Sequence, residues 1–222
     1  QEFPDLSKLT DTQNYKNQNE IKFANNDYKN FPETIKDFFN FLNSKIFLNF
    51  LQTITSIKES LIADEQLNGG GLHEIKTGGL LKVHTDFSKH PTNNFDRRVN
   101  VLIYLNHNWK ESYGGSLELW DKEVKKCVKK IIPIFNRVVI FNTNDFSFHG
   151  NPEPINCPDQ TNTRKSIALY YYSNGRPKNE ISDKDHITIF KNRPNTKDST
   201  SLTYFKKIFW KIYLKKKGSS RN

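Results

Sequence analysis

The sequence predicts a mostly β fold with flanking helices, an α+β chain whose core is a sandwich or barrel of jelly-roll type. Seven short strand-like runs follow one another closely between residues 72 and 172, separated by turn residues. A helical periodicity precedes them over residues 31–54. At 222 residues the chain is long enough for one large domain, and we expect a single domain in total.

Before the strands, the chain divides into a leader and a helical support. Residues 1–30 are polar and without clear periodicity, so we expect an irregular leader with one short strand near residues 21–24. Pro32 and Glu33 favour a helix start, and we expect a helical support over residues 31–67. One broken helix or two is predicted by apolar residues at three- and four-residue steps, namely Ile35, Phe38, Phe39, Leu42, Ile46, Phe47, Phe50, Leu51 and Ile54.

The predicted catalytic core covers residues 68–180. The run NGGG at residues 68–71 ends the helical pattern, and Pro133 and the pair Gly114-Gly115 separate later runs. The strands are predicted at residues 72–76, 80–84, 98–105, 116–120, 127–132, 137–142 and 166–172.

The C-terminal extension, residues 181–222, carries most of the positive charge. The net charge is +10, and seven basic residues with no acidic one follow position 203, so residues 1–203 carry only +3. Nucleic acid is therefore not an expected partner. From Asp198 the pattern is that of a basic amphipathic helix with Phe205, Ile208, Phe209 and Ile212 on one stripe. This helix either packs on the barrel or contacts a membrane surface or an acidic partner.

Composition excludes some other classes of protein. No run reaches the roughly 18 apolar residues of a membrane helix, and no secretory signal is recognisable at the start. The two cysteines, Cys127 and Cys157, could form one disulfide at most and lack the spacing of a zinc site. We expect a reduced, cytoplasmic protein.

The run LLKVHTD at residues 80–86 is the strongest indication of chemistry. In a strand, side chains two residues apart share a face, so His84 and Asp86 can converge on one point. His149 follows another strand-like run and is the best candidate for a third ligand. Two histidines and one carboxylate form the facial arrangement that suits iron(II) in oxygen-activating enzymes.

A cosubstrate with a carboxylate would need a cation of its own. Arg164 lies fifteen residues after His149 at the start of the next strand, where its guanidinium could reach the pocket floor. Arginine suits bidentate carboxylate binding, and Ser166, on the same strand face, can add a hydroxyl donor. Without further context, a surface ion pair is the alternative for this arginine.

Residues 69–177 resemble the iron(II)- and 2-oxoglutarate-dependent oxygenases, in particular their prolyl-4-hydroxylase-like branch. The resemblance rests on motifs that fall in the family's order: HTD at 84–86, RVNVLIYLNHNW at 98–109, GGSLELW at 114–120, PIFNRVVIF at 133–141, HG at 149–150 and the run from Arg164 to Tyr172. It implies a double-stranded β-helix core with helices packed on one face.

The resemblance also implies roles for single residues. His84, Asp86 and His149 would bind iron(II), the expected metal, and all three would be catalytic. Arg164 and Tyr104 would bind the distal carboxylate of 2-oxoglutarate. The implied reaction decarboxylates 2-oxoglutarate with O2 and hydroxylates an unactivated C–H bond, with ascorbate as a further cofactor.

Other implied positions line the cosubstrate slot or face the substrate. Leu117 and Leu102 would line the slot, and Arg97 or Arg98 would lie near the substrate. The substrate would be a peptide, a protein residue or a small metabolite, and neither its identity nor the oligomeric state can be inferred.

The sequence also departs from the family. Leu81 and Glu74 stand roughly where relatives often have tyrosines, so the contact to the iron-proximal carboxylate is open, with His73 as one replacement or as an ordinary strand histidine. The stretch from His149 to Arg164 is longer than in many relatives, and the extra loop either shapes substrate entry or is tolerated length. The remaining histidines fit no ligand spacing and are predicted at the surface; they are His90, His107 and His186.

Two further functions compete with the hydroxylase. The net charge suggests a nucleic-acid dealkylating oxygenase of the same superfamily, but those enzymes carry a second arginine where this chain has Tyr170. The other is a catalytically silent barrel used as a binding module, against which the apparently complete ligand set argues.

Overall fold

The computed structural model describes residues 3–158, 162–181, 185–196 and 198. Twelve strands and two α-helices lie in this part of the chain. The strands are β1 Gln13–Lys16, β2 Glu20–Asn25, β3 Ile62–Ala63, β4 Gly71–Ile75, β5 Leu80–Thr85, β6 Asp96–Tyr104, β7 Leu117–Trp120, β8 Cys127–Ile131, β9 Arg137–Asn142, β10 His149–Asn151, β11 Arg164–Ser173 and β12 Ile189–Phe190. The helices are α1 Glu33–Leu42 and α2 Lys45–Thr55, with 3₁₀ turns at Leu6–Lys8, Tyr28–Asn30, Glu111–Tyr113 and Lys178–Glu180.

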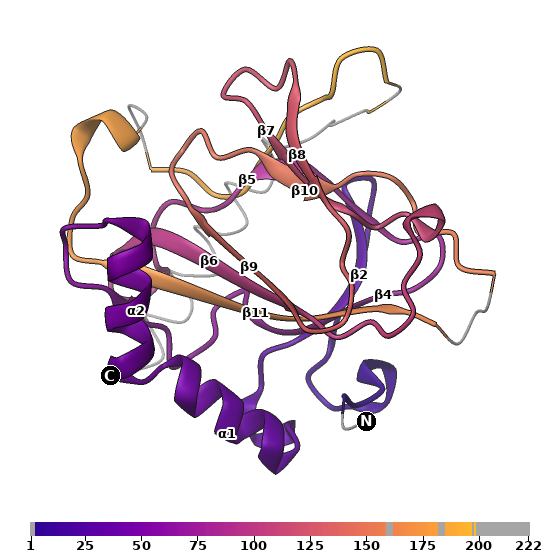
Figure 1. Ribbon diagram of the computed structural model, residues 1–222, viewed down its shortest axis with the longest axis horizontal. Helices are drawn as coiled ribbons and strands as arrows, with labels where there is room; N and C mark the ends of the chain where they lie inside the picture. Colours follow the sequence, from indigo (N-terminus) through magenta and orange to yellow (C-terminus); the bar gives the residue numbers. More distant parts are fainter. Residues whose placement is uncertain (1–2, 159–161, 182–184, 197, 199–222) are drawn as a thin grey trace, which may run out of the picture.

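All the strands join one antiparallel sheet that curls over on itself. Its main path runs β8-β7-β10-β5-β2-β4-β11-β6-β9, while β1, β3 and β12 pair at its margins with β2, β11 and β5. Figure 1 shows the two layers that result, with β5, β7, β8 and β10 in one layer and β4, β6, β9 and β11 in the other. Strand β2 pairs with both β4 and β5 and so connects the layers. The predicted jelly-roll class with flanking helices is confirmed.

The seven predicted strands are all present, each with ends within two residues of the prediction. The leader contains more structure than predicted, because β1 and β2 form a hairpin and β2 is an integral strand of the barrel. Strands β3, β10 and β12 were not predicted. Each has only two or three residues, too few for a period-two pattern to show.

The helical region forms two helices rather than one. The break falls at Asn43 and Ser44, where the Ser44 hydroxyl accepts a hydrogen bond from the Phe47 amide at 3.4 Å and caps the start of α2. Pro32 occupies the N-cap of α1, and Glu33 begins the helix.

The helices cover one face of the sheet, as predicted (Figure 1). The largest apolar cluster joins Ile35, Phe39 and Leu51 of the helices to Val101 of β6 and Leu169 of β11. The hydrophobic effect of this shared core fixes the outer surface of the β6/β11 layer and leaves the opposite face of these strands for the barrel interior.

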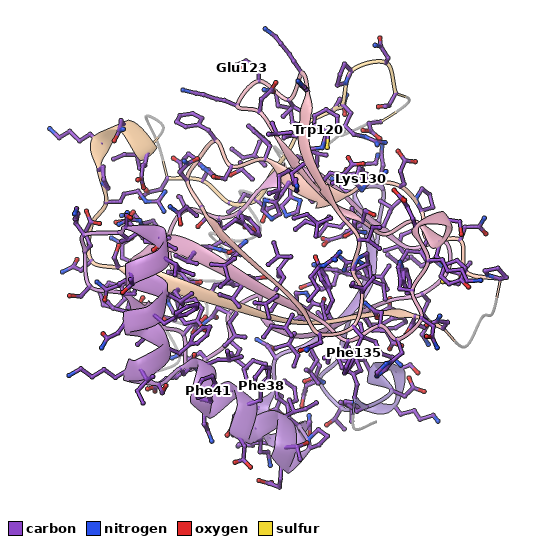
Figure 2. The ribbon with its side chains drawn as sticks, in the orientation of Figure 1. Phe38, Phe41, Trp120, Glu123, Lys130 and Phe135 are labelled. Carbon is purple, nitrogen blue, oxygen red and sulfur yellow. The ribbon has the colours of Figure 1, made fainter. Side chains whose placement is uncertain are left out.

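The outer side of the helices is apolar in places. Phe41, Phe50 and Ile46 are exposed, and Figure 2 shows Phe41 on the outside of the helical layer. None of the helices in the described ranges is long and apolar enough to cross a membrane. The predicted amphipathic helix after Asp198, with its suggested membrane contact, lies outside the described residues, and the division of the chain into domains stays a prediction.

Candidate metal and cosubstrate site

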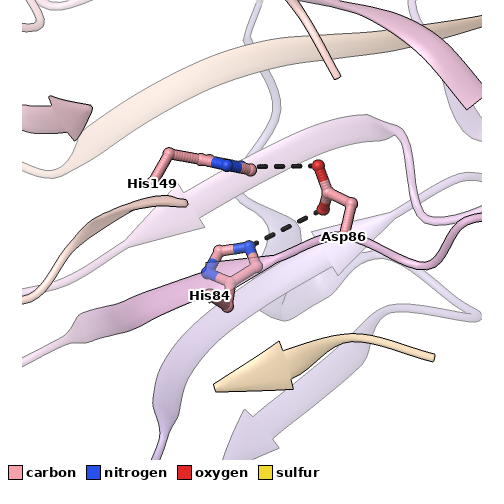
Figure 3. A group of neighbouring side chains, drawn as sticks. All are labelled: His84, Asp86 and His149. Atoms are coloured by element: carbon pink, nitrogen blue, oxygen red, sulfur yellow. Dashed lines mark ion pairs between the residues drawn. The ribbon is translucent and has the colours of Figure 1, made fainter. Parts of the chain in front are cut away.

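Strand β5 brings His84 and Asp86 to one end of the barrel interior. Asp86 lies one residue beyond the end of the strand, and the extended backbone keeps it on the same side as His84. The Nε2 atom of His84 lies 3.6 Å from Oδ1 of Asp86. Figure 3 shows both this imidazole and that of His149 directed at the Asp86 carboxylate.

His149 reaches the same point from the neighbouring strand β10. It pairs directly with His84 across the two strands, and the ring centroids are 4.5 Å apart. Gly150 makes this approach possible, because a Cβ atom at that position would lie only 2.7 Å from the Leu81 carbonyl oxygen. The Nε2 atom of His149 lies 3.4 Å from Oδ2 of Asp86.

The two histidines turn their Nε2 atoms to the centre of the group. Nδ1 of His84 donates to the Lys82 carbonyl at 2.8 Å, and Nδ1 of His149 donates to the Ser147 carbonyl at 2.9 Å. Since a carbonyl can only accept, the proton of each neutral ring is on Nδ1 and the lone pair is on Nε2. Burial lowers the pKa of His149 to about 4, which keeps that ring neutral near pH 7.

One ligand atom from each of the three residues lies within 4.8 Å of the other two. With two imidazoles and one carboxylate, this donor set fits a divalent transition metal such as iron(II). The backbone carbonyls behind both rings supply the outer hydrogen bonds that metal-bound histidines normally make.

Asp86 is held by groups that the sequence did not identify. Nη2 of Arg97 lies 3.1 Å from its Oδ2, and the Asn100 amide donates to the same oxygen at 2.8 Å. Burial would raise the pKa of Asp86, but the charge of Arg97 holds it well below its usual range. The Arg97 guanidinium also lies 3.4 Å from the centroid of the Tyr170 ring and 4.5 Å from that of Phe87.

A β-bulge separates the two arginines that were predicted near the substrate. Across β6 and β11, Tyr171 pairs with Val99 but Tyr172 pairs with Arg97, so Arg98 is the extra residue. The bulge turns Arg97 to the side of Asn100 and Asp86. Arg98 bonds elsewhere, to Glu59 at 2.7 Å and to the Ser173 hydroxyl at 2.9 Å, and the structure does not bring it to the three-residue group.

Arg164 and Tyr104 meet deeper in the barrel. Nη2 of Arg164 donates to the Tyr104 hydroxyl at 3.2 Å, and its Nε donates to the Gly115 carbonyl at 2.7 Å. Both side chains are buried, and Arg164 makes no ion pair with a carboxylate among the described residues. Burial lowers the pKa of Arg164 and raises that of Tyr104. Ser166 is buried beside them, since it pairs directly with Tyr104 across the two strands.

An apolar cluster connects this arginine to the histidines. Tyr104, Leu117 and Leu102 belong to it, together with Phe141, whose ring lies 4.9 Å from that of His149. The two leucines predicted to line a cosubstrate slot therefore lie in the cluster between the two polar groups.

The two positions where relatives often have tyrosines hold Leu81 on β5 and Glu74 on β4, next to His73, the predicted replacement. His73 lies on β4, where its Nε2 is buried without a hydrogen-bond partner, and burial with the nearby charges of Lys22 and Arg164 lowers its pKa to about 3. Glu74 accepts a hydrogen bond from the Thr163 hydroxyl at 2.7 Å. His73 is therefore neutral and lies opposite Ser166 across the strand pair, a placement compatible with either predicted role.

Two of the three histidines predicted at the surface are not there. His90 is buried, and its Nε2 lies 3.3 Å from Oδ1 of Asp64. The His186 side chain is largely buried and lies 3.1 Å from Oδ1 of Asp145. Only His107 is exposed, stacked on Phe135. A lone histidine between polar neighbours carries no pattern that predicts a buried carboxylate partner.

A small depression opens beside Asp86. It encloses about 150 Å³ of space, part of it open to solvent. Its lining residues are Asp86, Phe87, Ser88, Arg97, Thr143, Asn144, Asp145 and Arg176.

The long loop between His149 and Arg164 packs on the barrel in its described part. Ile155 is buried against Trp109 and Ile75, and its amide and carbonyl bond to Gly79 and Gly78 at 3.0 and 2.7 Å. This part of the loop contributes to the core.

Comparison with known proteins gives the same assignment. The family model of the 2OG-Fe(II) oxygenase superfamily matches residues 70–172. Prolyl 3-hydroxylase OGFOD1 of Mus musculus is 32% identical over 80 residues, which cover 34% of this chain but only 14% of that protein, so the chain spans a small part of the curated relative it matches.

Solved structures of prolyl 4-hydroxylases are also similar to this chain. One from Pseudomonas putida has 12% identity and a TM-score of 0.49, with 74% of this chain and 79% of that chain covered. One from Phytophthora capsici has 22% identity and a TM-score of 0.45, with 69% and 47% covered.

The matched segment contains both polar groups described above, His84, Asp86 and His149 at one end and Arg164 with Tyr104 at the other. The predicted family and its cofactors, Fe(II), 2-oxoglutarate and O2, are therefore confirmed, while ascorbate stays a prediction. Residues 70–172 match the 2OG-Fe(II) oxygenase superfamily, which bears out the predicted family for this part of the chain.

Proposed function

We propose that this chain is an iron(II)- and 2-oxoglutarate-dependent hydroxylase of the prolyl-4-hydroxylase-like type. One observation carries the proposal: two buried histidines and a carboxylate share the barrel interior with a buried arginine that has no carboxylate partner among the described residues. The first group fits the metal, and the second fits the distal carboxylate of the cosubstrate.

In this proposal His84, Asp86 and His149 hold the metal, and Arg164 and Tyr104 hold 2-oxoglutarate. Iron(II) with 2-oxoglutarate and O2 supplies the oxidising power for C–H hydroxylation. The chain's own residues hold and orient these groups. The carbonyls of Lys82 and Ser147 orient the two imidazoles.

The surroundings of the metal group complete its geometry. Arg97 and Asn100 fix one oxygen of Asp86, which keeps the carboxylate ionised and leaves the other oxygen turned to His84. The apolar cluster of Leu102, Leu117 and Phe141 excludes water from the space between the two polar groups.

The proposed substrate is a prolyl residue in a peptide or protein. The support is the curated relative, which is named a prolyl 3-hydroxylase. A free amino acid or another small metabolite is the alternative that the same experiment separates.

The test is 2-oxoglutarate turnover with purified protein and iron(II), read as succinate and as a +16 Da product. Proline-containing peptides, the same peptides with alanine for proline, and free amino acids form the substrate panel. We expect succinate coupled to a +16 Da product on the prolyl peptides, abolished by His149→Ala. Iron binding without succinate across the whole panel would contradict the hydroxylase, and a product on free amino acids alone would contradict the peptide substrate.

The competing functions find less support. Tyr170 occupies the position where nucleic-acid dealkylating oxygenases carry a second arginine, and its hydroxyl donates to the Gly69 carbonyl at 3.0 Å while its ring covers Arg97. A silent barrel would not need to retain all three ligand residues. We also propose a cytoplasmic location, because the chain has only two cysteines, Cys127 and Cys157, enough for one disulfide at most.

A further inference from the structure

A segment outside the matched family region returns to the metal-binding strand. Residues 185–193, here called the strap, follow the core, and their two-residue strand β12 pairs antiparallel with β5. In the register of this pair Phe190 lies opposite His84 and Ile189 lies opposite Thr85. The Lys191 amide adds a hydrogen bond to the Val83 carbonyl at 2.9 Å. In Figure 3, β12 is the pale yellow arrow below His84.

This pairing places an aromatic ring against a proposed iron ligand. Residues directly opposite each other in an antiparallel pair project from the same face, so Phe190 shares the face of His84. The centroids of their rings are 5.4 Å apart, and His149 lies on the other side of His84 at 4.5 Å. Phe190, His84 and His149 thus form a row of three rings across β12, β5 and β10.

Hydrogen bonds and ion pairs hold the strap in place on both sides of β12. Towards its start, the Ser88 amide donates to the His186 carbonyl at 3.0 Å, and the His186 amide donates to the Ser88 hydroxyl at 3.0 Å. Towards its end, Arg193 forms ion pairs with Glu153 and with Asp198, the latter at 2.8 Å. Ser88 lines the depression beside Asp86, so the strap also borders this depression.

The strap closes an edge that would otherwise be open. Strand β2 pairs with β5 only at Leu80 and Leu81, while β12 covers His84 and Thr85. Without β12, the part of β5 that carries the ligand would have an unpaired edge and His84 would lack a packing partner on one side. An unpaired edge and a free ring face both increase local motion.

We propose that the strap supports the iron site. In this proposal Phe190 is a positioning residue that holds the His84 imidazole in its ligand orientation. The inference rests on the proposed function, since it takes His84 to be a metal ligand. Its effect reaches the metal through the ring of His84, because Phe190 has no donor atom of its own. The strap therefore slows loss of the metal.

The test compares Phe190→Ala with Ile189→Ala, a matched control that removes a similar apolar side chain from the same strand opposite Thr85 rather than His84. Cobalt(II) serves as the metal probe, because its visible spectrum reports on ligand geometry. We expect the cobalt dissociation constant to rise about tenfold in Phe190→Ala. This is the usual size of the effect when a residue that orients a metal ligand is removed. The Ile189→Ala value should stay within about twofold of the wild type, and Phe190→Leu should recover most of the affinity.

The rate at which EDTA removes cobalt and the shape of the visible spectrum complete the experiment. Faster removal and a changed spectrum in Phe190→Ala alone support the inference, with far-UV circular dichroism confirming that each variant folds. Equal affinities, rates and spectra for wild type and Phe190→Ala would overturn it, as would equal losses in both alanine variants. Failure of the wild type to bind cobalt would instead count against the proposed function.

Discussion

Two arginines are buried in the same barrel, and their surroundings are opposite. Arg97 is 2% exposed and Arg164 is 5% exposed. Arg97 has a carboxylate at 3.1 Å, that of Asp86, and the Asn100 side chain accepts from its Nε at 3.1 Å. Among the described residues, Arg164 bonds to a phenol and a backbone carbonyl, those of Tyr104 and Gly115.

The pKa values of the two guanidinium groups shift in opposite directions, in line with these surroundings. Burial would lower both. At Arg97 the charge of Asp86 and the neighbouring tyrosines outweigh burial and raise the pKa, whereas at Arg164 burial prevails and the pKa falls. A buried cation without a carboxylate costs several kcal/mol. Arg97 therefore completes an ion pair of the folded protein, while in the proposed function Arg164 receives its carboxylate from the ligand.

The largest expected effect is on cosubstrate affinity when Arg164 is removed. Arg164→Met should raise the dissociation constant of 2-oxoglutarate on the order of a thousandfold, because the ligand carboxylate would lose its buried partner. The free energy of unfolding of the ligand-free protein should stay the same or rise, since an uncompensated buried charge is replaced by an apolar chain of similar length. Calorimetric titration with manganese-loaded protein and urea unfolding measure the two quantities.

Arg164→Lys separates charge from geometry at this position. Lysine keeps a positive charge but cannot form two parallel hydrogen bonds to one carboxylate, so we expect an affinity between those of the wild type and Arg164→Met. If Arg164→Met bound 2-oxoglutarate as the wild type does, Arg164 would not be the carboxylate partner and the contrast with Arg97 would lose its meaning.

The second expected effect is on folding stability rather than on cosubstrate affinity. Arg97→Met should lower the free energy of unfolding of the metal-free protein by about 3 kcal/mol, because it leaves the Asp86 carboxylate buried without its cation. A divalent metal on Asp86 would replace part of the lost charge, so the difference should shrink when manganese is present. Urea unfolding with and without manganese checks both statements. If manganese left the loss of unfolding free energy in Arg97→Met unchanged, Arg97 would act through its packing on Tyr170 and Phe87 rather than through Asp86.

Most of the site could be predicted because its members are marked by local sequence. His84 and Asp86 have the period-two spacing of a strand face, and Arg164 begins a clear strand. Arg97 and Arg98 could not be told apart, because the bulge at Arg98 reverses the alternation and depends on the partner strand β11. Asn100 and Tyr170 were missed for a similar reason, since their contacts to Asp86 and Arg97 come from tertiary packing.

The fold was predictable to a similar extent. Strands of four or more residues in the core showed their period, whereas β10 and β12 are too short to show one. Strand β12 carries the Phe190 contact to His84 across more than a hundred residues of sequence. Pairing between such distant segments is decided by the closed sheet, and no local pattern near residue 190 indicates it.

The smallest expected effect concerns His186, a cation that resembles Arg97 in its pairing but can lose its charge. Burial lowers its pKa, but the hydrogen bonds to Asp145 and to the Ile187 carbonyl outweigh burial and the nearby charge of Arg176, so the pKa is raised above 6.5. A raised pKa in the folded state means that protonated His186 stabilises the fold. This contribution is complete below pH 6.5, the unfolded-state value, and is lost as the pH rises through the raised folded-state pKa.

The destabilisation caused by His186→Gln should therefore be larger at about pH 5.5 than at about pH 8.5, measured by urea unfolding at both values. His107→Gln, a change at the exposed histidine stacked on Phe135, controls for the loss of a histidine as such. A difference that is constant with pH, or that grows as the pH rises, would mean that His186 does not carry its charge in the fold. In that case the contact between His186 and Asp145 would not be an equivalent of the Arg97 pair.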